Sequence, residues 1–296
     1  MSSAPPSTAA ATTRRFALLT EGPVEVPVPA GVDGMHAALA DLPPGVYSGL
    51  RSFPGGRFLA LEAHVARAER SARALGFELG GERAALLAGL QRVVDDARPH
   101  DLKLRFDLLP EPFAIGGVRA RLWLATAPFV PVPQRYLEHG VRVEIADGLV
   151  RETPLVKTTE FVLRRRPYPL ESEQAYEHLL LDGGGHVLEC SSANFYVVRG
   201  DALVTAGSGV LEGVTRGLVL RLAEELGLTV ELRAPLVDEA VTWDEALLSS
   251  STRGLVPVVD VAGVQVGSGR PGPWTRRLSE AYAQLAEREA ARALPE

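Results

Sequence analysis

The chain has 296 residues, a hydrophobic fraction of 46% and a formal net charge of −6 at pH 7. This length is enough for two domains with separate cores, and the acidic balance offers no positive surface for nucleic acid. The sequence contains no run of roughly 18 consecutive apolar residues, so it predicts no membrane-spanning helix. The single cysteine, Cys190, cannot form an intrachain disulfide, and we expect a cytoplasmic protein.

The N-terminal half of the sequence alternates strand and helix patterns. Residues 1–13 are rich in Ser, Ala, Pro and Thr, and we interpret them as a disordered leader. Apolar residues then recur at helical spacing over 61–76, where a glycine ends the pattern. The expected elements are strands at 15–20, 46–53 and 58–61, helices at 61–76 and 82–97, and strands at 101–109 and 118–127.

A proline-rich segment separates the two halves. Pro128-Phe129-Val130-Pro131-Val132-Pro133 is stiff and extended, so we predict an interdomain linker over 128–134. Further elements are expected as a strand at 141–146, hairpins within 179–190 and 195–205, a helix at 214–226, a strand at 230–233, a short helix near 242–246, strands around 255–266 and a helix at 274–291. The fold class is therefore α/β (α+β), with N-terminal and C-terminal α/β domains over 14–127 and 135–296.

Lysine is rare in this chain. Of the 31 basic residues only Lys103 and Lys157 are lysines. Arginine supplies positive charge equally well, but its guanidinium cannot be deprotonated to act as an amine nucleophile. A lysine in this background is a candidate nucleophile, although chance retention explains a single lysine equally well.

Three further features suggest a site for a charged ligand. Gly213-Val214-Thr215-Arg216 opens an expected helix, whose first N–H groups can bind phosphate, although an ordinary capping turn explains the same residues. Ser249-Ser250-Ser251-Thr252 offers hydroxyl groups, but serine runs are usually plain loops. Glu189 lies in an apolar strand and needs a positive partner if it faces inward.

Other catalytic patterns are missing from the sequence. The six histidines show no metal-ligand spacing, so we predict no metal site, and His64 is expected to pack on its own helix. The sequence also has no Gly-x-Ser-x-Gly elbow and no P-loop, and the turn at Gly183–Gly185 lacks the Gly-x-Gly-x-x-Gly spacing and the helix of a dinucleotide site.

Five segments, in this order, resemble the class IV aminotransferases. These fold-type IV pyridoxal-phosphate enzymes include branched-chain aminotransferases, D-amino-acid aminotransferases and aminodeoxychorismate lyases. The segments are His64-x-x-Arg67, Val156-Lys157-Thr158-Thr159, Leu188-Glu189-Cys190-Ser191-Ser192-Ala193-Asn194-Phe195, Leu211-Glu212-Gly213-Val214-Thr215-Arg216, and Ser249-Ser250-Ser251-Thr252 followed by Leu255-Val256-Pro257-Val258. The resemblance covers about residues 46–285 and implies two domains with pyridoxal 5′-phosphate bound between them.

The resemblance implies a role for each matching residue. Lys157 falls on the Schiff-base lysine, and Glu189 falls on the glutamate that pairs with the pyridine nitrogen. The implied phosphate-binding residues are Arg67, Val214, Thr215 and Ser251. Leu211 matches a residue packed on the cofactor ring, and Thr252 lies in the turn that approaches the substrate carboxylate.

The sequence departs from the family at positions that recognise substrate. Cys190 replaces a glycine, Val162 replaces the aromatic residue of branched-chain enzymes, and residues 43–49 replace a glycine-rich acidic stretch. Arg51 and Arg105 are candidate partners for a substrate carboxylate. We expect no basic cluster suited to a dicarboxylate.

These residues predict a pyridoxal-phosphate-dependent aminotransferase. It would move an amino group between an amino acid, of the branched-chain or D-amino acid type, and a 2-oxo acid, as a homodimer with no nucleic acid or membrane partner. One alternative is a lyase of the aminodeoxychorismate type that releases pyruvate. Another is a non-catalytic fold-type IV binding protein, which the joint retention of Arg67, Lys157 and Glu189 disfavours.

Overall fold

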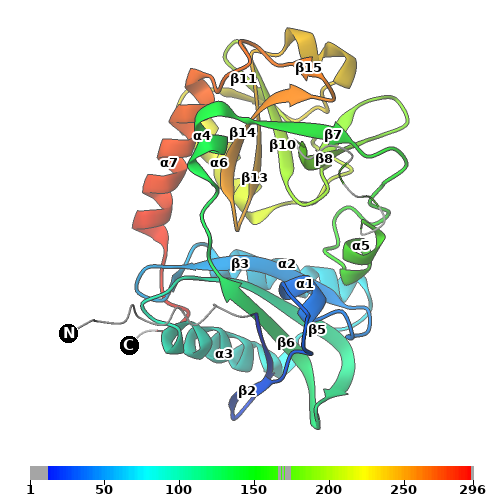
Figure 1. The fold of residues 1–296 in the computed structure, drawn as a ribbon, viewed down its shortest axis with the longest axis vertical. Coiled ribbons are helices and arrows are strands. Elements are labelled where there is room, and N and C mark those ends of the chain that lie inside the picture. Colours follow the sequence, from blue (N-terminus) through cyan, green and yellow to red (C-terminus); the bar gives the residue numbers. More distant parts are fainter. Residues whose placement is uncertain (1–12, 166–167, 169, 171–174, 295–296) are drawn as a thin grey trace, which may run out of the picture.

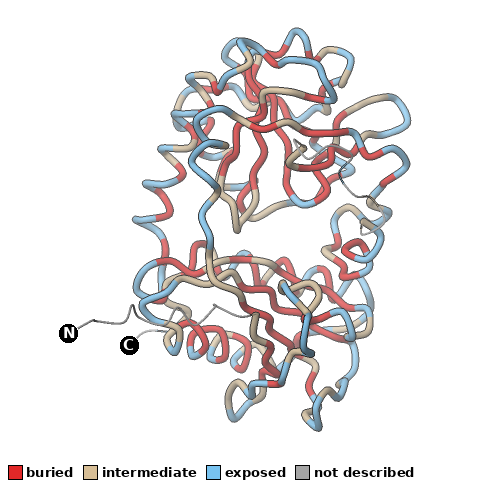
Figure 2. The backbone as a smooth tube through the Cα atoms, in the orientation of Figure 1, coloured by how far each residue is buried: buried red, intermediate tan, exposed pale blue. Residues whose placement is uncertain are grey.

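Two β-sheets lie one above the other in the computed structural model, which describes residues 13–165, 168, 170 and 175–294 (Figure 1). Of the leader predicted at residues 1–13, all but Thr13 lies outside the described residues. The buried backbone concentrates in the strands of both sheets and in the helix faces that cover them (Figure 2). The mixed helix and strand architecture agrees with the predicted fold class. No described helix is both long and apolar enough to cross a membrane.

The first sheet is antiparallel and has the strand order β2-β1-β6-β5-β3-β4. Along β5 the apolar residues Leu104, Phe106 and Leu108 point to one face, where they form a core with helices α2 and α3. The alternate residues, Lys103 and Arg105 among them, point to the other face. The elements of this half of the chain are β1 (Arg14–Leu19), β2 (Gly22–Val26), α1 (Met35–Ala38), β3 (Val46–Phe53), β4 (Arg57–Phe58), α2 (Leu61–Ala74), η1 (Gly80–Glu82), α3 (Arg83–Asp96), β5 (Leu102–Ile115) and β6 (Val118–Pro128).

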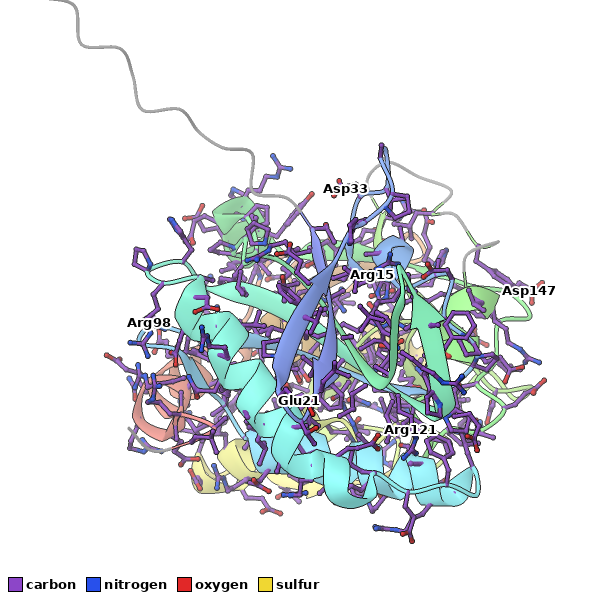
Figure 3. All side chains as sticks on the ribbon, turned by 90° about the horizontal axis from the view of Figure 1, so that it is seen from below. Arg15, Glu21, Asp33, Arg98, Arg121 and Asp147 are labelled. Carbon is purple, nitrogen blue, oxygen red and sulfur yellow. The ribbon has the colours of Figure 1, made fainter. Side chains whose placement is uncertain are left out.

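Helix α1 covers part of that second face. Seen from below, Arg15 on β1 lies beside this short helix (Figure 3). The buried Arg15 guanidinium donates to the Ala38 carbonyl at 3.0 Å and to the Asp41 carboxylate at 2.9 Å. This anchor fixes the segment that carries His36.

The second sheet closes on itself. Its order is β12-β11-β10-β13-β14-β7-β8-β9, and a pairing of Glu189 with Asn194 joins β9 back to β10. The ring of β10, β13, β14, β7, β8 and β9 therefore closes at Glu189. The elements of this half are α4 (Gln134–His139), β7 (Val141–Ile145), α5 (Thr159–Arg164), β8 (Ala175–Leu181), β9 (Val187–Cys190), β10 (Asn194–Arg199), β11 (Ala202–Val204), α6 (Val214–Glu225), β12 (Thr229–Glu231), η2 (Val237–Thr242), β13 (Glu245–Ser250), β14 (Gly254–Val261), β15 (Val264–Gln265) and α7 (Pro273–Glu289).

The two halves are joined by a shared core and by the end of the chain. Phe53 and Leu59 pack in one apolar cluster with residues of α6 and α7. After α7 the chain returns to the first sheet, where Phe58 and Ala291 exchange two backbone hydrogen bonds of 2.7 and 2.9 Å. These contacts fix the relative position of the two sheets on the side where α7 lies.

Most expected elements are present with ends shifted by a few residues, but some expectations are wrong. The short helix expected near 242–246 is the end of η2 followed by strand β13, because residues 245–250 pair with β10 on one side and β14 on the other. The strand expected at 58–61 is limited to Arg57–Phe58, since α2 begins at Leu61. Gln134, at the end of the predicted linker, begins α4.

The segment that carries Lys157 is bound to the edge of β3. The Tyr47 N–H donates to the Lys157 carbonyl at 3.0 Å, and the Lys157 N–H donates to the Ser71 hydroxyl of α2 at 3.2 Å. Two residues on, the Thr159 N–H donates to the Gly45 carbonyl at 2.9 Å. The backbone of Lys157 is thus held in register with the first sheet.

Gly45 permits this close contact. A methyl group at position 45 would lie 2.5 Å from the Leu108 carbonyl oxygen. We expect Gly45→Ala to lower the free energy of unfolding by about 1–3 kcal/mol, the cost of inserting a methylene into packed structure. Urea unfolding measures this loss. Gly81→Ala is the control, because a methyl group there meets no atom within 4 Å, and equal midpoints for the two variants would contradict the contact.

Candidate active site

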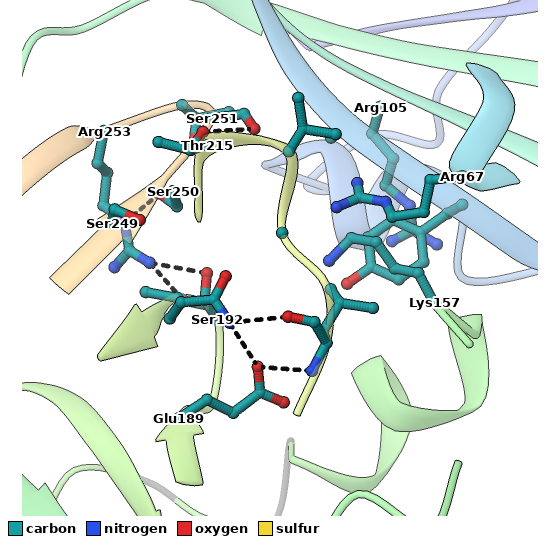
Figure 4. Close-up of a pocket in the computed structure, with 18 of the residues that line it drawn as sticks. Arg67, Arg105, Lys157, Glu189, Ser192, Thr215, Ser249, Ser250, Ser251 and Arg253 are labelled. Atoms are coloured by element: carbon teal, nitrogen blue, oxygen red, sulfur yellow. Dashed lines mark hydrogen bonds between the residues drawn. The ribbon is translucent and has the colours of Figure 1, made fainter. Parts of the chain in front are cut away.

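A cavity of about 250 Å³ lies between the two sheets and collects side chains from both (Figure 4). Arg67, Arg105 and Lys157 lie on one side of it, and Ser250, Ser251 and Arg253 lie on the other. Of the residues predicted from the sequence, those that line this cavity are Arg67, Arg105, Lys157, Glu189, Leu211, Val214, Thr215, Ser251 and Thr252. The fold therefore brings together residues that are far apart along the chain, since Arg67 and Thr252 are 252 − 67 = 185 positions apart.

The Lys157 amine lies over an aromatic ring in this cavity. Its Nζ is 4.6 Å from the centre of the Tyr47 ring. Burial lowers the pKa of Lys157 to about 8, and the positive charges of Arg67 and Arg151 act in the same direction. A useful fraction of the amine is therefore neutral, and hence nucleophilic, near neutral pH.

Tyr47 lies between two cations. The Arg105 guanidinium stacks on its ring at 4.5 Å from the ring centre, in addition to the Lys157 contact. Burial by itself raises the pKa of Tyr47, but the charges of Lys157, Arg165 and Arg105 outweigh it and lower the pKa to about 8. The sequence placed Tyr47 only within the substrate-recognition stretch 43–49, because nothing in the local pattern marks this tyrosine as a partner of Lys157.

Glu189 has a positive partner within the chain. The Arg151 Nε donates to its Oε1 at 2.7 Å, and both side chains are almost fully buried. The Asn194 side chain and the Leu211 N–H donate to Oε2, each at 3.3 Å. Burial raises the pKa of Glu189, while Arg151 opposes that shift. Arg151 was also missed from the sequence, since no motif includes it.

Helix α6 directs its first N–H groups to the cavity. Gly213 precedes the helix and provides no side-chain cap. A Cβ atom there would lie 2.1 Å from the Asn194 Oδ1, so the chain requires glycine at this turn. The Thr215 hydroxyl in the first turn of α6 and the Ser251 hydroxyl at the end of β13 are hydrogen-bonded at 3.0 Å. The helix start and the tip of the β13–β14 hairpin thus form one anion-binding cup.

Arg67, on helix α2, faces the same cavity from the side of the first sheet. It is only 5% exposed, and its Nη2 donates to the Ser48 hydroxyl at 3.0 Å. Ser48 in turn is hydrogen-bonded to His64 Nδ1 at 2.9 Å, so His64 packs between its helix and β3 and supports Arg67. The buried Arg67 Nε has no hydrogen-bond partner among the described residues. An orphaned guanidinium donor of this kind fits a phosphate oxygen.

The cavity contains a basic cluster that the sequence did not predict. Two guanidinium groups converge on the His36 ring, with Arg105 Nη1 at 2.5 Å from Nδ1 and Arg165 Nη2 at 3.1 Å from Nε2. A neutral imidazole has one acceptor nitrogen, so one of these two arginines has a donor to spare. Asp107 forms two hydrogen bonds with Arg105, of 2.7 and 2.6 Å, and offsets one charge. The cluster was missed because α1 carries His36 to β5 only in the folded chain.

Arg51 does not line the cavity. Its guanidinium lies between two aromatic rings, 4.0 Å from the centre of Phe53 and 4.0 Å from that of Phe129. Arg51 is on the same face of β3 as Tyr47 and Gly49. Its side chain nevertheless lines a separate cavity with Phe53 and Phe129. The structure therefore gives no support to Arg51 as a partner of a substrate carboxylate.

The hairpin tip beside the cup is held by Arg253, which sequence reasoning also missed. Its Nε donates to the Ser250 hydroxyl at 2.9 Å, and its Nη2 donates to the Ser192 carbonyl at 3.0 Å. Its Nη1 forms an ion pair with the buried Glu177 at 3.0 Å. These bonds order the turn that presents Ser251 and Thr252.

Two of the three departures from the family pattern, Cys190 and Val162, lie in packed regions, whereas Tyr47 and Gly49 of the third line the cavity. Cys190 belongs to the core enclosed by the second sheet, where burial raises the pKa of its thiol well above the ordinary value. Val162 is 3% exposed in α5. Neither side chain lines the cavity.

The family model for amino-transferase class IV matches residues 45–261. The D-alanine aminotransferase of Bacillus licheniformis is 30% identical over 244 residues, which are 80% of this chain and 86% of that protein. The branched-chain-amino-acid aminotransferase of Escherichia coli is 34% identical over 108 residues, which are 36% of this chain and 35% of that protein.

Solved structures share the fold. A branched-chain aminotransferase from Thermoproteus uzoniensis superimposes with a TM-score of 0.72 over 96% of this chain and 100% of its own, at 21% identity. A branched-chain amino acid aminotransferase from Escherichia coli gives a TM-score of 0.70 over 93% and 94% of the two chains, at 23% identity. With a family match over most of its length, the chain belongs to the class IV aminotransferases, the family that its motifs resemble.

Proposed function

We propose that this aminotransferase binds pyridoxal 5′-phosphate in the cavity and moves an amino group between a small or acidic amino acid and a 2-oxo acid. One observation carries the proposal. A neutralisable lysine, a buried carboxylate and an anion cup, drawn from four separate segments, all line the same cavity. A related structure with pyridoxamine 5′-phosphate, of a branched-chain amino acid aminotransferase from T.th., supports the cofactor assignment at the level of fold.

The cavity residues fit this cofactor. Arg67, the first N–H groups of α6 and the hydroxyls of Thr215 and Ser251 would hold the phosphate. Glu189 would face the ring nitrogen and keep it protonated, and Lys157 would attach to the aldehyde carbon. When bound, the cofactor supplies an electron sink for negative charge at the substrate carbon.

Lys157 has the properties of the proton-moving base. Its lowered pKa leaves a neutral amine that can accept a proton from the substrate carbon and return it to a second carbon. The backbone bonds to Tyr47 and Ser71 hold the lysine in place, so only its side chain moves. Arg151 favours the charged form of Glu189, because its ion pair opposes the effect of burial, which raises the pKa.

The cluster of Arg105, Arg165 and His36 is the proposed partner of a substrate carboxylate. The spare guanidinium donor described above would bind the carboxylate oxygen, with the Tyr47 ring alongside. This cationic wall favours a small or acidic side chain over a branched apolar one, since burying apolar atoms against unpaired charges is unfavourable. A homodimer and a cytoplasmic location stay predictions from the sequence, as do the proposed domain bounds of 14–127 and 135–296.

The first prediction for this function concerns Lys157. Borohydride reduction of the cofactor-loaded protein should attach the cofactor to Lys157 and not to Lys103, as peptide mapping will reveal. When the cofactor is added to the cofactor-free protein, the rate at which it bonds to Lys157 should rise about tenfold per pH unit and level off above about 8, because only the neutral amine reacts. Tyr47→Phe should move this midpoint lower, since the Tyr47 charge raises the pKa of Lys157. A midpoint near the ordinary lysine value would contradict the assignment.

A second prediction concerns the phosphate cup. Arg67→Ala should weaken cofactor affinity by roughly 10- to 100-fold, the range for losing a hydrogen bond to a charged group. Equilibrium titration of the cofactor-free protein measures the change. Arg73→Ala removes an exposed charge from the same helix and should leave affinity unchanged. If the two variants bind the cofactor equally well, Arg67 is not part of the cup.

The reaction itself is tested by adding amino donors to the loaded enzyme without any 2-oxo acid. We expect one enantiomer of alanine or glutamate to remove the visible absorption of the cofactor, and a 2-oxo acid to restore it. Arg105→Gln should slow this conversion, because the carboxylate loses its anchor. Release of pyruvate from aminodeoxychorismate, with no donor able to change the spectrum, would contradict transamination.

A further inference from the structure

Lys103 lines the same cavity and has no role in the site described above. It precedes Arg105 by two residues on β5, so both side chains project from one face of the sheet, with Cα atoms about 7 Å apart. Its side chain is half-buried. In the described part of the chain it forms no ion pair with a carboxylate, and burial and the charge of Arg253 both lower its pKa.

The charge of Arg253, which contributes to the lowered pKa of Lys103, is paired with a carboxylate. All three nitrogens of Arg253 are hydrogen-bonded, to Ser250, Ser192 and Glu177, and Glu177 offsets its charge. These bonds use four of the five N–H groups of Arg253, so it has one donor left, whereas the Lys103 ammonium has three and no carboxylate partner among the described residues. A half-buried ammonium beside a second cation is unfavourable unless an anion approaches it.

The other anion-binding groups of the cavity have separate tasks. Arg67, Thr215 and Ser251 form the phosphate cup, and the cluster of Arg105 with His36 would hold one carboxylate. Lys103 lies one pleat repeat from Arg105 along β5, within the influence of the Arg253 charge at the hairpin tip. An anion bound by Lys103 is therefore a second charged group, displaced from the first along the strand.

We propose that Lys103 is a specificity-determining residue that binds a second carboxylate of the substrate, so that the preferred pair is a dicarboxylic amino acid and its 2-oxo acid. The inference rests on the proposed function, because it assumes that substrate enters this cavity beside the cofactor. A single monocarboxylic substrate would leave the Lys103 ammonium unpaired.

The test compares the holoenzyme with Lys103→Gln, Lys103→Arg and Arg92→Gln. Arg92 is an exposed residue of α3, so its variant controls for the loss of one positive charge far from the cavity. For each protein, the rate of spectral conversion is measured with glutamate and with alanine. Calorimetry measures the binding of two unreactive acids, glutarate and butyrate.

Lys103→Gln should lose roughly 10- to 100-fold in kcat/KM for glutamate and in glutarate affinity, as for a lost hydrogen bond between charged groups. Alanine and butyrate should change by less than about threefold, within the range of a surface substitution. Lys103→Arg should recover most of the loss, and Arg92→Gln should match the wild type.

Equal losses for glutamate and alanine would overturn the proposal, as would glutarate binding no tighter than butyrate. A fall in cofactor affinity in Lys103→Gln would also overturn it, because the lysine would then serve the phosphate. If no donor converts the wild-type cofactor, the proposed function fails on its own account. The glutarate and butyrate affinities would still decide the role of Lys103.

Discussion

An excess of positive charge around one cavity is the constraint on which the rest of the structure depends. Arg67, Arg105, Arg151, Lys157 and Arg165 line it, and Asp107 and Glu189 offset only two of them. Enclosed charges of one sign repel strongly, so the site requires anions from outside the chain. The phosphate of the cofactor and the carboxylates of the substrate have the charge that is missing. Burial and the neighbouring positive charges together lower the pKa of Lys157, and the attraction of the same charges for the phenolate lowers the pKa of Tyr47. Ligand binding is thereby linked to the reactivity of the amine.

The fold holds these charges in place by means that do not depend on the ligand. The second sheet closes at the pairing of Glu189 with Asn194, so the carboxylate is fixed by the geometry of the ring. The Lys157 segment is bound to the edge of β3, and the Arg253 network fixes the hairpin tip. Because the ends of α7 and β4 are joined by backbone bonds, the two walls of the cavity keep their separation. The site is thereby preorganised for its ligands.

Much of the fold was predictable from the sequence, because helical periodicity and turn residues mark the ends of β3, α2, α6 and α7. The expected helix near 242–246 failed, since pairing on both edges of β13 outweighs local propensity. Within the site, Lys157 and Glu189 belong to short local motifs and could be recognised. Arg151, Arg165 and His36 could not, because their proximity arises only when the chain folds. The prediction for Arg51 did not foresee that its guanidinium stacks between two aromatic rings.

The account is tested most directly by the melting temperature of the cofactor-free protein with added pyridoxal phosphate, pyridoxal or inorganic phosphate. Pyridoxal phosphate at about 100 times its dissociation constant should stabilise the fold by about 2.7 kcal/mol. For a chain of this size that raises the melting temperature by several degrees, roughly 2–4 °C per kcal/mol. Pyridoxal, which lacks the phosphate, should give a clearly smaller rise at the same concentration, and phosphate alone a small one. A rise with pyridoxal equal to that with pyridoxal phosphate would contradict a cavity whose excess positive charge is balanced by the phosphate of its cofactor.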